Sequence, residues 1–311
     1  EVIQVIDKEL SPPGKGEVQI RQTAIGFNFI DVYQRSGYYP LDLPTGLGHE
    51  AVGVVEALGD GVAGLKVGDR VMYMNAGIGA YASARNVAAD KLVPVPNNVA
   101  DEVAAAVFFK AMTAQYLIQK TYKVKAGDVV LVHAAAGGVG QILAGWAKAL
   151  GAFVVGSVGS QAKVAAAKAA GCDAVVDYSQ PNWVEEFLKA TGGKKANVVY
   201  DSVAKTTFMG SLDCVAPFGT LALFGAASGP APEIQPEILN KKGCLFLTRP
   251  SVFPHNSTHA LLQENAKAVF DAIAKGYVKV QIGAKFPLEQ AADAHRAAEG
   301  RKVSGAIVMI P

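Results

Sequence analysis

The sequence predicts an α/β fold of two domains, a barrel-like domain of mostly antiparallel strands and a doubly wound parallel sheet. Up to about residue 110, short β-rich runs alternate with turn residues, as in antiparallel sheets. From about residue 113 to 250, apolar β-branched runs alternate with helical segments, as in parallel sheets covered on both faces. The length of 311 residues suits two domains, because one domain usually spans roughly 100 to 200 residues.

The first domain is predicted from strand candidates at 17–27, 51–59, 69–74 and 80–89. Turn-rich runs such as "SPPGKG" and "GDGVAGLKVGD" separate these candidates. The opening run, "EVIQVIDKEL", also has the composition of a strand. Together these features predict a β-barrel.

The second domain is predicted from four strands that each precede a helix. The strands "DVVLVHA", "AFVVGSV", "AVVDY" and "ANVVYDS" precede helices expected at 138–150, 161–170, 182–191 and 206–214. The runs "GTLALFG" and "CLFLTR" add two more strands. This order predicts a doubly wound sheet.

The segment after about residue 255 is too short for a third core. It contains a predicted helix at 258–276, strands in "VKVQIGAKF" and "GAIVMI", and a helix in "LEQAADAHRAAEG". We therefore assign it to the first domain, which then comprises 1–112 and 253–311, with 113–252 as the second. A cleft between the domains is the expected site.

Composition narrows the class of protein. The formal net charge is +2, with scattered Lys and Arg residues, so we expect no nucleic-acid partner. Cys172, Cys214 and Cys244 lie far apart, and the N-terminus lacks a signal-peptide pattern; both features favour a cytoplasmic location. Residues 129–150 are long and apolar, but polar residues and four glycines interrupt them, so we expect no membrane span.

A glycine-rich turn in the second domain predicts dinucleotide binding. Ala135-x-Gly137-x-x-Gly140 lies directly after a predicted strand, at the start of a predicted helix. Such a turn brings backbone N–H groups close to a pyrophosphate. The alternative is a glycine-rich packing turn, which the strand–turn–helix context disfavours.

The missing carboxylate after the second strand of this domain favours NADPH over NADH. NADH usually meets an Asp or Glu about 20 residues after the glycine turn, where the carboxylate binds the ribose hydroxyls. No acidic residue occurs between Asp128 and Asp173, and Lys163 lies in this zone. Lys163 by itself could be a solvated helix residue, but the missing carboxylate favours a 2′-phosphate.

His49 and Glu50 raise the question of a catalytic zinc. Such a site needs about three protein ligands from Cys, His and carboxylate side chains. No cysteine precedes Cys172, and no His/Cys cluster accompanies His49. We therefore expect no metal, and a packed or hydrogen-bonded His49.

The motifs "GHEAVGVV", "GLKVGDRV" and "AAAGGVG" resemble the medium-chain dehydrogenase/reductase superfamily over essentially the whole chain. Within it, "NFIDVYQRSGYYP", "VVYDSV" and "LTRPS" are similar to the zinc-free quinone oxidoreductases, which include zeta-crystallin. The resemblance implies a GroES-like barrel, a Rossmann domain and a homodimer. It also implies that Asn28 and Phe109 stand where zinc-dependent relatives have cysteines. One departure is Gly145, where that family usually has Gln.

The resemblance further implies a set of cofactor contacts. They are Thr113, Gly137, Gly138, Val139 and Gly140 around the pyrophosphate, Gly159, Lys163, Tyr178 and Arg301 around the adenosine phosphate, and Ser202, Phe224, Gly225 and Ser228 around the nicotinamide. Lys163 and Arg301 could give charge-assisted bonds to phosphate. An exposed loop arginine is the alternative for Arg301.

The expected reaction is hydride transfer from NADPH to a small quinone. Asn28, Tyr33 and Tyr39 could donate hydrogen bonds to the nicotinamide or to acceptor oxygens that gain charge. A turn role for Asn28 and core roles for the tyrosines are the alternatives. No proton relay is recognisable, so water could supply the proton. Other functions left open are reduction of 2-alkenals or enones, and an NADPH-binding role that is mainly structural or RNA-binding.

Overall fold

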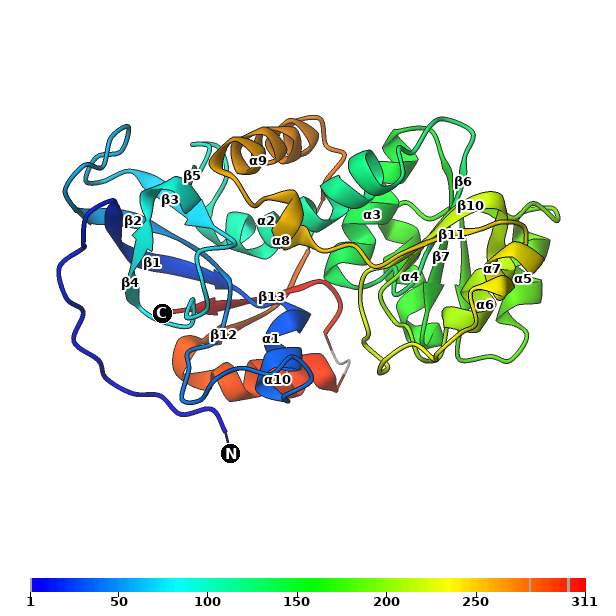
Figure 1. Cartoon of the computed structure of the whole chain (residues 1–311), viewed down its shortest axis with the longest axis horizontal. Helices are drawn as coiled ribbons and strands as arrows, with labels where there is room; N and C mark the ends of the chain where they lie inside the picture. The colour runs from blue at the N-terminus through cyan, green and yellow to red at the C-terminus, as the bar shows by residue number, and fades with distance from the viewer. Residues whose placement is uncertain (1, 280, 301–302) are drawn as a thin grey trace. The chain divides into compact units, whose positions relative to one another are not determined.

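The computed structural model describes residues 2–279, 281–300 and 303–311. The chain divides into two compact units (Figure 1). The first comprises Glu1–Lys110, Phe253–Phe270 and Val280–Pro311, and the second comprises Ala111–Val252 and Asp271–Lys279.

In the described residues of the first unit, seven strands form one sheet. Its order is β12-β13-β1-β2-β3-β5, and β4 also pairs with β1. Every pairing is antiparallel except that of β12 with β13. The strands are β1 (Glu17–Gly26), β2 (Glu50–Leu58), β3 (Arg70–Tyr73), β4 (Ala84–Ala88), β5 (Val93–Pro94), β12 (Ile282–Pro287) and β13 (Ala306–Ile310).

Alternating burial along β1 explains this sheet. Val18, Ile20 and Ala24 are fully buried, and Arg21 between them is exposed, which is the period of a strand with one face on the core. The helices α1 and α10 lie side by side (Figure 1). The helical bounds are α1 (Phe29–Arg35), α2 (Asp101–Tyr116), α8 (Val252–His255), α9 (His259–Ala274) and α10 (Ala291–Glu299).

The described strands of the second unit form a parallel six-stranded sheet in the order β11-β10-β9-β6-β7-β8. Its central strands are apolar on both faces, as parallel strands covered by helices must be. The strands are β6 (Val129–Val132), β7 (Phe153–Val158), β8 (Ala174–Asp177), β9 (Ala196–Asp201), β10 (Val215–Leu223) and β11 (Phe246–Thr248). The helices are α3 (Gly138–Ala149), α4 (Val164–Ala169), α5 (Trp183–Ala190), α6 (Phe208–Cys214) and α7 (Glu237–Lys241).

The predicted fold class is confirmed, with local differences. Residues 2–14 form neither helix nor strand, so the strand predicted in "EVIQVIDKEL" is wrong; Val2, Val5 and Ile6 find no sheet face and stay exposed. The helices α1 and α2 were not predicted. Residues 271–279, predicted in the first domain, group with the second unit. In the part of the chain that is described, none of the helices has the length and apolar character of a membrane span.

Candidate active site

The loop between β6 and α3 has the geometry of an anion-binding turn. Gly137, the N-cap of α3, is extended (φ −82°, ψ 170°) and offers no side chain. In the described chain, the backbone N–H groups of Gly138, Val139 and Gly140 meet no hydrogen-bond acceptor. A Cβ at Gly140 would lie 2.3 Å from the carbonyl oxygen of Ala134, so only glycine fits. The loop therefore offers unused donors at the positive end of a helix, which suits a pyrophosphate.

The residues predicted for the adenosine phosphate follow β7 and β8. A Cβ on Gly159 would lie 2.7 Å from the hydroxyl of Tyr178, so these two residues are in contact. Lys163 ends a short 3-10 helix and is half-buried. The next acidic residue in the chain, Asp173, forms an ion pair with Lys148. The zone after β7 therefore contains a cationic residue, Lys163, and the first carboxylate after it in the sequence is paired with Lys148.

The residues predicted for the nicotinamide follow β9 and β10. Phe224, the first residue after β10, donates its N–H to the carbonyl oxygen at the end of β9 (2.8 Å). A Cβ at Gly225 would lie 2.6 Å from the carbonyl oxygen of Ser202. The Ser228 hydroxyl donates to the carbonyl oxygen of Val203 (2.7 Å). The structure therefore brings the predicted set Ser202, Phe224, Gly225 and Ser228 together.

The strand order reverses between β6 and β9. The glycine loop follows β6, and Ser202 follows β9. Ligands of doubly wound sheets bind at this switch point, outside the carboxyl ends of the strands. Two predicted cofactor residues are not placed by these contacts. Thr113 is a buried residue of α2, and Arg301 lies outside the described residues.

Tyr33 and Tyr39 belong to a cluster of aromatic rings in the first unit. The Tyr33 ring meets those of Phe29, Tyr38 and Tyr39 edge-on, at centroid distances of 5.2, 5.4 and 5.3 Å. Tyr38 and Tyr39 stack at 5.2 Å. Phe29 is 36% and Tyr38 is 42% exposed, so the cluster offers ring surface to a flat ligand. Sequence reasoning missed Phe29 and Tyr38, although the i, i+4 spacing of Phe29 and Tyr33 was a signal.

Asn28 is held in a buried charged network. Its Nδ2 donates to Oε2 of Glu50 (2.9 Å), and its Oδ1 accepts from Nζ of Lys110 (3.1 Å). Lys110 also donates to the carbonyl oxygen of Phe27 (2.9 Å), and Glu50 accepts the N–H of Phe109 (2.6 Å). These partners fix the Asn28 amide, because the reversed amide would turn its NH₂ toward the ammonium. Asn28 is therefore oriented from within the unit.

Burial sets the protonation of this network. It lowers the pKa of Lys110 and raises that of Glu50, and each charge partly offsets the shift of the other. Asp31 accepts the N–H of Asn28 and the hydroxyl of Tyr81, both at 3.0 Å. Burial raises the pKa of Asp31 to about 7, against the opposing effects of these hydrogen bonds and of Lys110. Asp31 therefore changes protonation near neutral pH.

Sequence reasoning missed Asp31, Lys110, Tyr81 and His295. The Tyr81 hydroxyl lies 3.2 Å from Nε2 of His295, whose pKa burial lowers to about 4, with Arg35 also lowering it. The available signal was Lys110 in the apolar run "AAAVFFKAMTA", because a charge in a buried helix needs a partner.

His49 packs among aromatic rings. Its Nε2 lies 3.0 Å from Oε1 of Gln34, and its ring centroid lies 5.3 Å from that of Phe253 and 6.3 Å from that of Phe109. Burial lowers the pKa of His49 to about 4, with Arg85 adding to the effect, so the ring is neutral at pH 7. Across residues 2–279, 281–300 and 303–311, no group of three or more His, Cys, Asp or Glu side chains could hold a metal ion.

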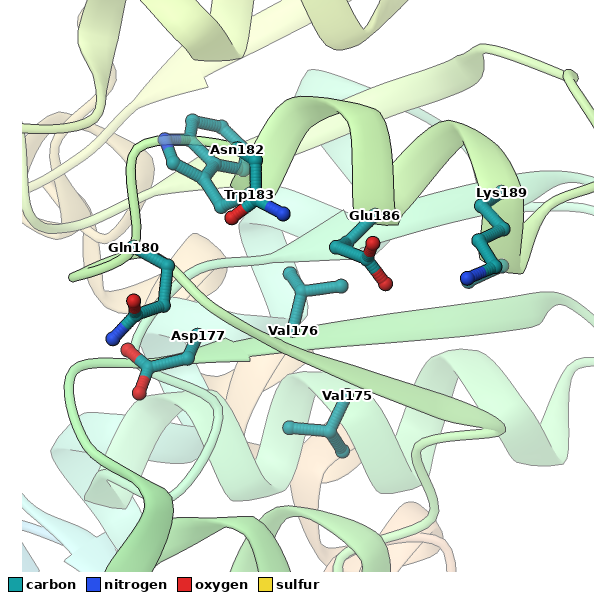
Figure 2. Close-up of a pocket in the computed structure, with 9 residues that line it drawn as sticks. Val175, Val176, Asp177, Gln180, Asn182, Trp183, Glu186 and Lys189 are labelled. Atoms are coloured by element: carbon teal, nitrogen blue, oxygen red, sulfur yellow. The ribbon is translucent and has the colours of Figure 1, made fainter.

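A hollow of ≈ 560 Å³ lies against β8 and α5 in the second unit. Figure 2 shows Asp177 and Gln180 toward one end, Lys189 toward the other, and Glu186 between them. Asp177 is already engaged, because it accepts the Ser179 hydroxyl at 2.7 Å. None of the residues predicted to bind the cofactor lines this hollow, so the glycine loop remains the candidate nucleotide site.

Two family models match the chain. The alcohol dehydrogenase GroES-like domain matches residues 14–97, and the zinc-binding dehydrogenase model matches residues 138–275. Both matches fall on the sheets described above, the first on strands β1 to β5 and the second on the parallel sheet from α3 onward.

Similar proteins span nearly the whole chain. A quinone oxidoreductase of Pseudomonas aeruginosa is 45% identical over 100% of this chain and 96% of its own length. A 2-haloacrylate reductase of Burkholderia sp is 43% identical over 97% of this chain and 93% of its own length. The crystal structure of Escherichia coli quinone oxidoreductase complexed with NADPH has a TM-score of 0.95 and 44% identity, covering 98% of this chain and 95% of that one. This chain therefore belongs to the quinone oxidoreductase family of the medium-chain dehydrogenase/reductase superfamily.

Proposed function

We propose that this protein is an NADPH-dependent quinone reductase that transfers hydride from NADPH to a small quinone without a metal. The observation that carries the proposal is whole-length similarity to quinone oxidoreductases, one of them solved with NADPH. NADPH supplies the hydride. The residues of this chain bind the cofactor, orient the two reactants and stabilise the charge that develops on the acceptor.

The second unit binds NADPH in this proposal. The unused N–H groups of Gly138, Val139 and Gly140 take the pyrophosphate, as donors at a helix N-terminus do in other nucleotide sites. Lys163 takes the 2′-phosphate beside Gly159 and Tyr178. Thr113 and Arg301 complete the phosphate contacts, and the loops after β9 and β10 take the nicotinamide half.

The aromatic cluster of the first unit binds the acceptor in this proposal. The partly exposed rings of Phe29 and Tyr38 suit the face of a quinone ring. The hydroxyls of Tyr39 and Tyr33 donate to quinone oxygens as hydride arrives. Asn28, oriented by Glu50 and Lys110, lines the nicotinamide side.

The proposed reaction needs no metal. Polarisation of a quinone oxygen by hydroxyl donors can replace a Lewis acid. The donor set supports this choice, because Asn28 and Phe109 offer no anionic ligand and the lone imidazole of His49 already contacts Gln34. A catalytic zinc site usually takes three protein ligands.

Reduction of an activated carbon–carbon double bond is the second candidate. The observation that favours it is the 43% identity to a 2-haloacrylate reductase. The same hydride donor and the same hydroxyl donors would serve an alkene conjugated to a carbonyl or carboxylate.

The test is the oxidation of NADPH, compared with NADH, by 1,4-benzoquinone, 9,10-phenanthrenequinone, a 2-alkenal and a 2-haloacrylate, with and without chelator. We expect fast, quinone-dependent oxidation of NADPH that chelator does not change. Turnover restricted to the alkenal or haloacrylate would replace the first candidate with the second. Loss of activity with chelator would contradict the metal-free mechanism, and tight NADPH binding without turnover of any acceptor would indicate a non-catalytic role.

The proposal includes a cytoplasmic homodimer. Each chain has the two predicted domains, 1–112 with 253–311 and 113–252, except that residues 271–279 belong to the second. The edge strand β11 and its neighbour β10 support the dimer, because Phe246 is 62% and Phe218 is 72% exposed. Apolar residues along a sheet edge are a means of pairing with a second chain. Light scattering of the wild type and of Phe246→Lys tests this; a wild-type mass of one chain would exclude the dimer.

A further inference from the structure

We propose that a buried hydrogen-bonded chain, Ser157–His133–Ser211–Asp201 (the His133 chain), positions the loops that hold the two halves of NADPH. Loss of this chain then impairs hydride transfer more than it impairs cofactor binding. The inference deepens the proposed function and rests on it for the identity of the cofactor.

The His133 chain joins four elements at the carboxyl end of the parallel sheet. Nδ1 of His133, which follows β6, lies 2.5 Å from the hydroxyl oxygen of Ser157 on β7. Nε2 of His133 lies 2.9 Å from the hydroxyl oxygen of Ser211 on α6. The Ser211 hydroxyl donates to Oδ2 of Asp201, the last residue of β9, at 2.8 Å. All four residues are fully buried.

The directions of the hydrogen bonds in the His133 chain follow from the single proton of Ser211 and from the neutral state of His133. The Ser211 hydroxyl has a single proton, and the Asp201 carboxylate can only accept it. The Ser211 oxygen must therefore accept from His133, which requires a proton on Nε2. Burial lowers the pKa of His133, against the opposing effect of Asp201, so the ring is neutral and its bare Nδ1 accepts the Ser157 hydroxyl.

Asp201 extends the chain into the loop after β9. Its Oδ1 accepts the N–H of Val203 (2.8 Å) and of Ala204 (3.0 Å). The Thr207 hydroxyl, also fully buried, lies 2.8 Å from Oδ2. These donors fix a tight turn in which Ala204 has φ 70°, a left-handed conformation that a non-glycine residue adopts only when its surroundings impose it.

His133 and Asp201 each adjoin one of the two cofactor loops covalently. Ala134, the first residue of the glycine loop, follows His133, and Ser202 of the nicotinamide loop follows Asp201. The hydrogen bonds from His133 through Ser211 to Asp201 (the bridge) therefore set the spacing of the two loops across the switch point between β6 and β9. Apolar side chains could fill the same space, so buried polar groups here indicate a demand for one defined geometry.

The two halves of the cofactor depend on this bridge to different degrees. In the proposed function the pyrophosphate meets backbone N–H groups at the start of α3, and we expect the hydrogen bonds of that helix to hold these groups largely in place when the bridge is cut. The nicotinamide meets the loop that Asp201 fixes, and a shift of about 1 Å in that loop can lower the rate of transfer by roughly 100-fold. Cutting the bridge should therefore lower kcat while leaving the Kd of NADPH nearly unchanged.

The test compares Ser211→Ala with Ser211→Thr, which restores the hydroxyl, and with Thr191→Val. Thr191 is a matched control, because its buried hydroxyl can donate to the carbonyl oxygen of Leu188 in α5 or to that of Lys194 just beyond the helix. For each variant, the Kd of NADPH and the emission of the bound nicotinamide are measured by fluorescence. The kcat and the isotope effect with NADPH deuterated at C4 are measured with the best acceptor. Nitrogen NMR of wild-type His133 reports its tautomer from pH 5.5 to 8.5.

We expect Ser211→Ala to lower kcat at least tenfold, raise the Kd of NADPH no more than threefold, increase the isotope effect and shift the nicotinamide emission. Ser211→Thr should recover most of kcat, and Thr191→Val should resemble the wild type. His133 should keep a proton on Nε2 alone throughout the pH range.

Two results would overturn the inference. One is an Nδ1-protonated or titrating His133, and the other is a Ser211→Ala enzyme that matches Thr191→Val in kcat, isotope effect and emission. If none of the acceptors supports oxidation of NADPH by the wild type, the proposed function fails. The tautomer of His133 and the emission of bound nicotinamide then still test whether the His133 chain positions the loops.

Discussion

The two units bury polar residues in different ways. The first unit holds full charges, Lys110 against Glu50, with the carboxyl of Asp31 beside them. The second unit holds a neutral imidazole and hydroxyls that end on one carboxylate, Asp201, which accepts several donors. Both clusters lie at predicted site residues, Asn28 in the first unit and Ser202 in the second.

This difference predicts how each cluster responds when one of its side chains is removed. A buried ion pair is expensive to break, because the remaining charge has lost its partner in a medium that solvates it poorly. The His133 chain would lose one hydrogen bond at Ser211 while Asp201 keeps its other donors, so the loss should alter geometry more than stability. We expect stability and pH effects to concentrate in the first unit and effects on hydride transfer in the second.

Removing the ammonium gives the largest expected effect. Lys110→Met should lower the free energy of unfolding by about 3 to 5 kcal/mol, because Glu50 would stay buried without its cation and would have to bear an unpaired charge or take up a proton. The double variant Lys110→Met/Glu50→Gln should lose much less, since it leaves no unpaired charge. Urea unfolding of both variants measures this. A cost below about 1 kcal/mol for the single variant would show that the pair behaves like a surface ion pair.

The pH dependence of stability should centre on Asp31. Its pKa is about 7 when folded and about 3.9 when unfolded. Its stabilising contribution is therefore complete below about pH 4 and is lost as the pH rises through about 7. Relative to Asp31→Asn, the wild type should lose roughly 2 to 4 kcal/mol of unfolding free energy between pH 4.5 and 8.

Unfolding of both proteins across this pH range measures the difference. The contributions of His49 and His295, which change in the opposite direction, are common to both proteins and cancel. Asp293→Asn is the control, because Asp293 is about half exposed and pairs with Arg296 on the surface. A parallel pair of stability curves for wild type and Asp31→Asn would rule out a raised pKa for Asp31.

A methyl group at Gly140 should weaken the cofactor site. The added Cβ would lie 2.3 Å from the carbonyl oxygen of Ala134, so the loop or α3 must move. We expect NADPH to bind at least tenfold more weakly, about 1.4 kcal/mol. Gly14→Ala is a control, because its Cβ meets only the flexible end of Glu17. Calorimetric titration with NADPH measures both, and equal affinities would remove Gly140 from the site.

Loss of one hydroxyl gives the smallest expected effect. Tyr39→Phe keeps the ring stacked on Tyr38 and removes the proposed donor. We expect kcat with 1,4-benzoquinone to fall about fivefold to tenfold, roughly 1 kcal/mol, with little change in the KM for NADPH. Tyr277→Phe, outside the aromatic cluster, serves as the control. Unchanged turnover would remove Tyr39 from the mechanism.

The fold was largely predictable because strands and helices follow local patterns. Alternation predicted β1, and the strand–turn–helix run predicted the loop at Gly137 to Gly140. The helix α2 was not predicted from the sequence because the positions from Ala104 to Ile118 are buried, so no amphipathic period marks it. The helix α1 was not predicted because its 7 residues are too few to establish a helical period of apolar residues.

The buried clusters were not predictable, because their partners are distant in the sequence. Lys110 and Asn28 are 82 residues apart, and His133 and Ser211 are 78 residues apart. Only the register of the sheets and the packing of α6 bring such residues together. A sequence shows that Lys110 lies in an apolar run but does not show which carboxylate neutralises it.

The end of β7 has a consequence for redesign of cofactor preference. Within three residues the chain passes from Ser157, which is fully buried against His133, to Gly159 and Ser160, which are partly exposed. The residues proposed to recognise the ribose, at 159 and 160, are therefore separable from Ser157, which belongs to the chain proposed to align the nicotinamide. An aspartate at position 160 with loss of the charge at Lys163 should shift the enzyme toward NADH while leaving the alignment for hydride transfer untouched.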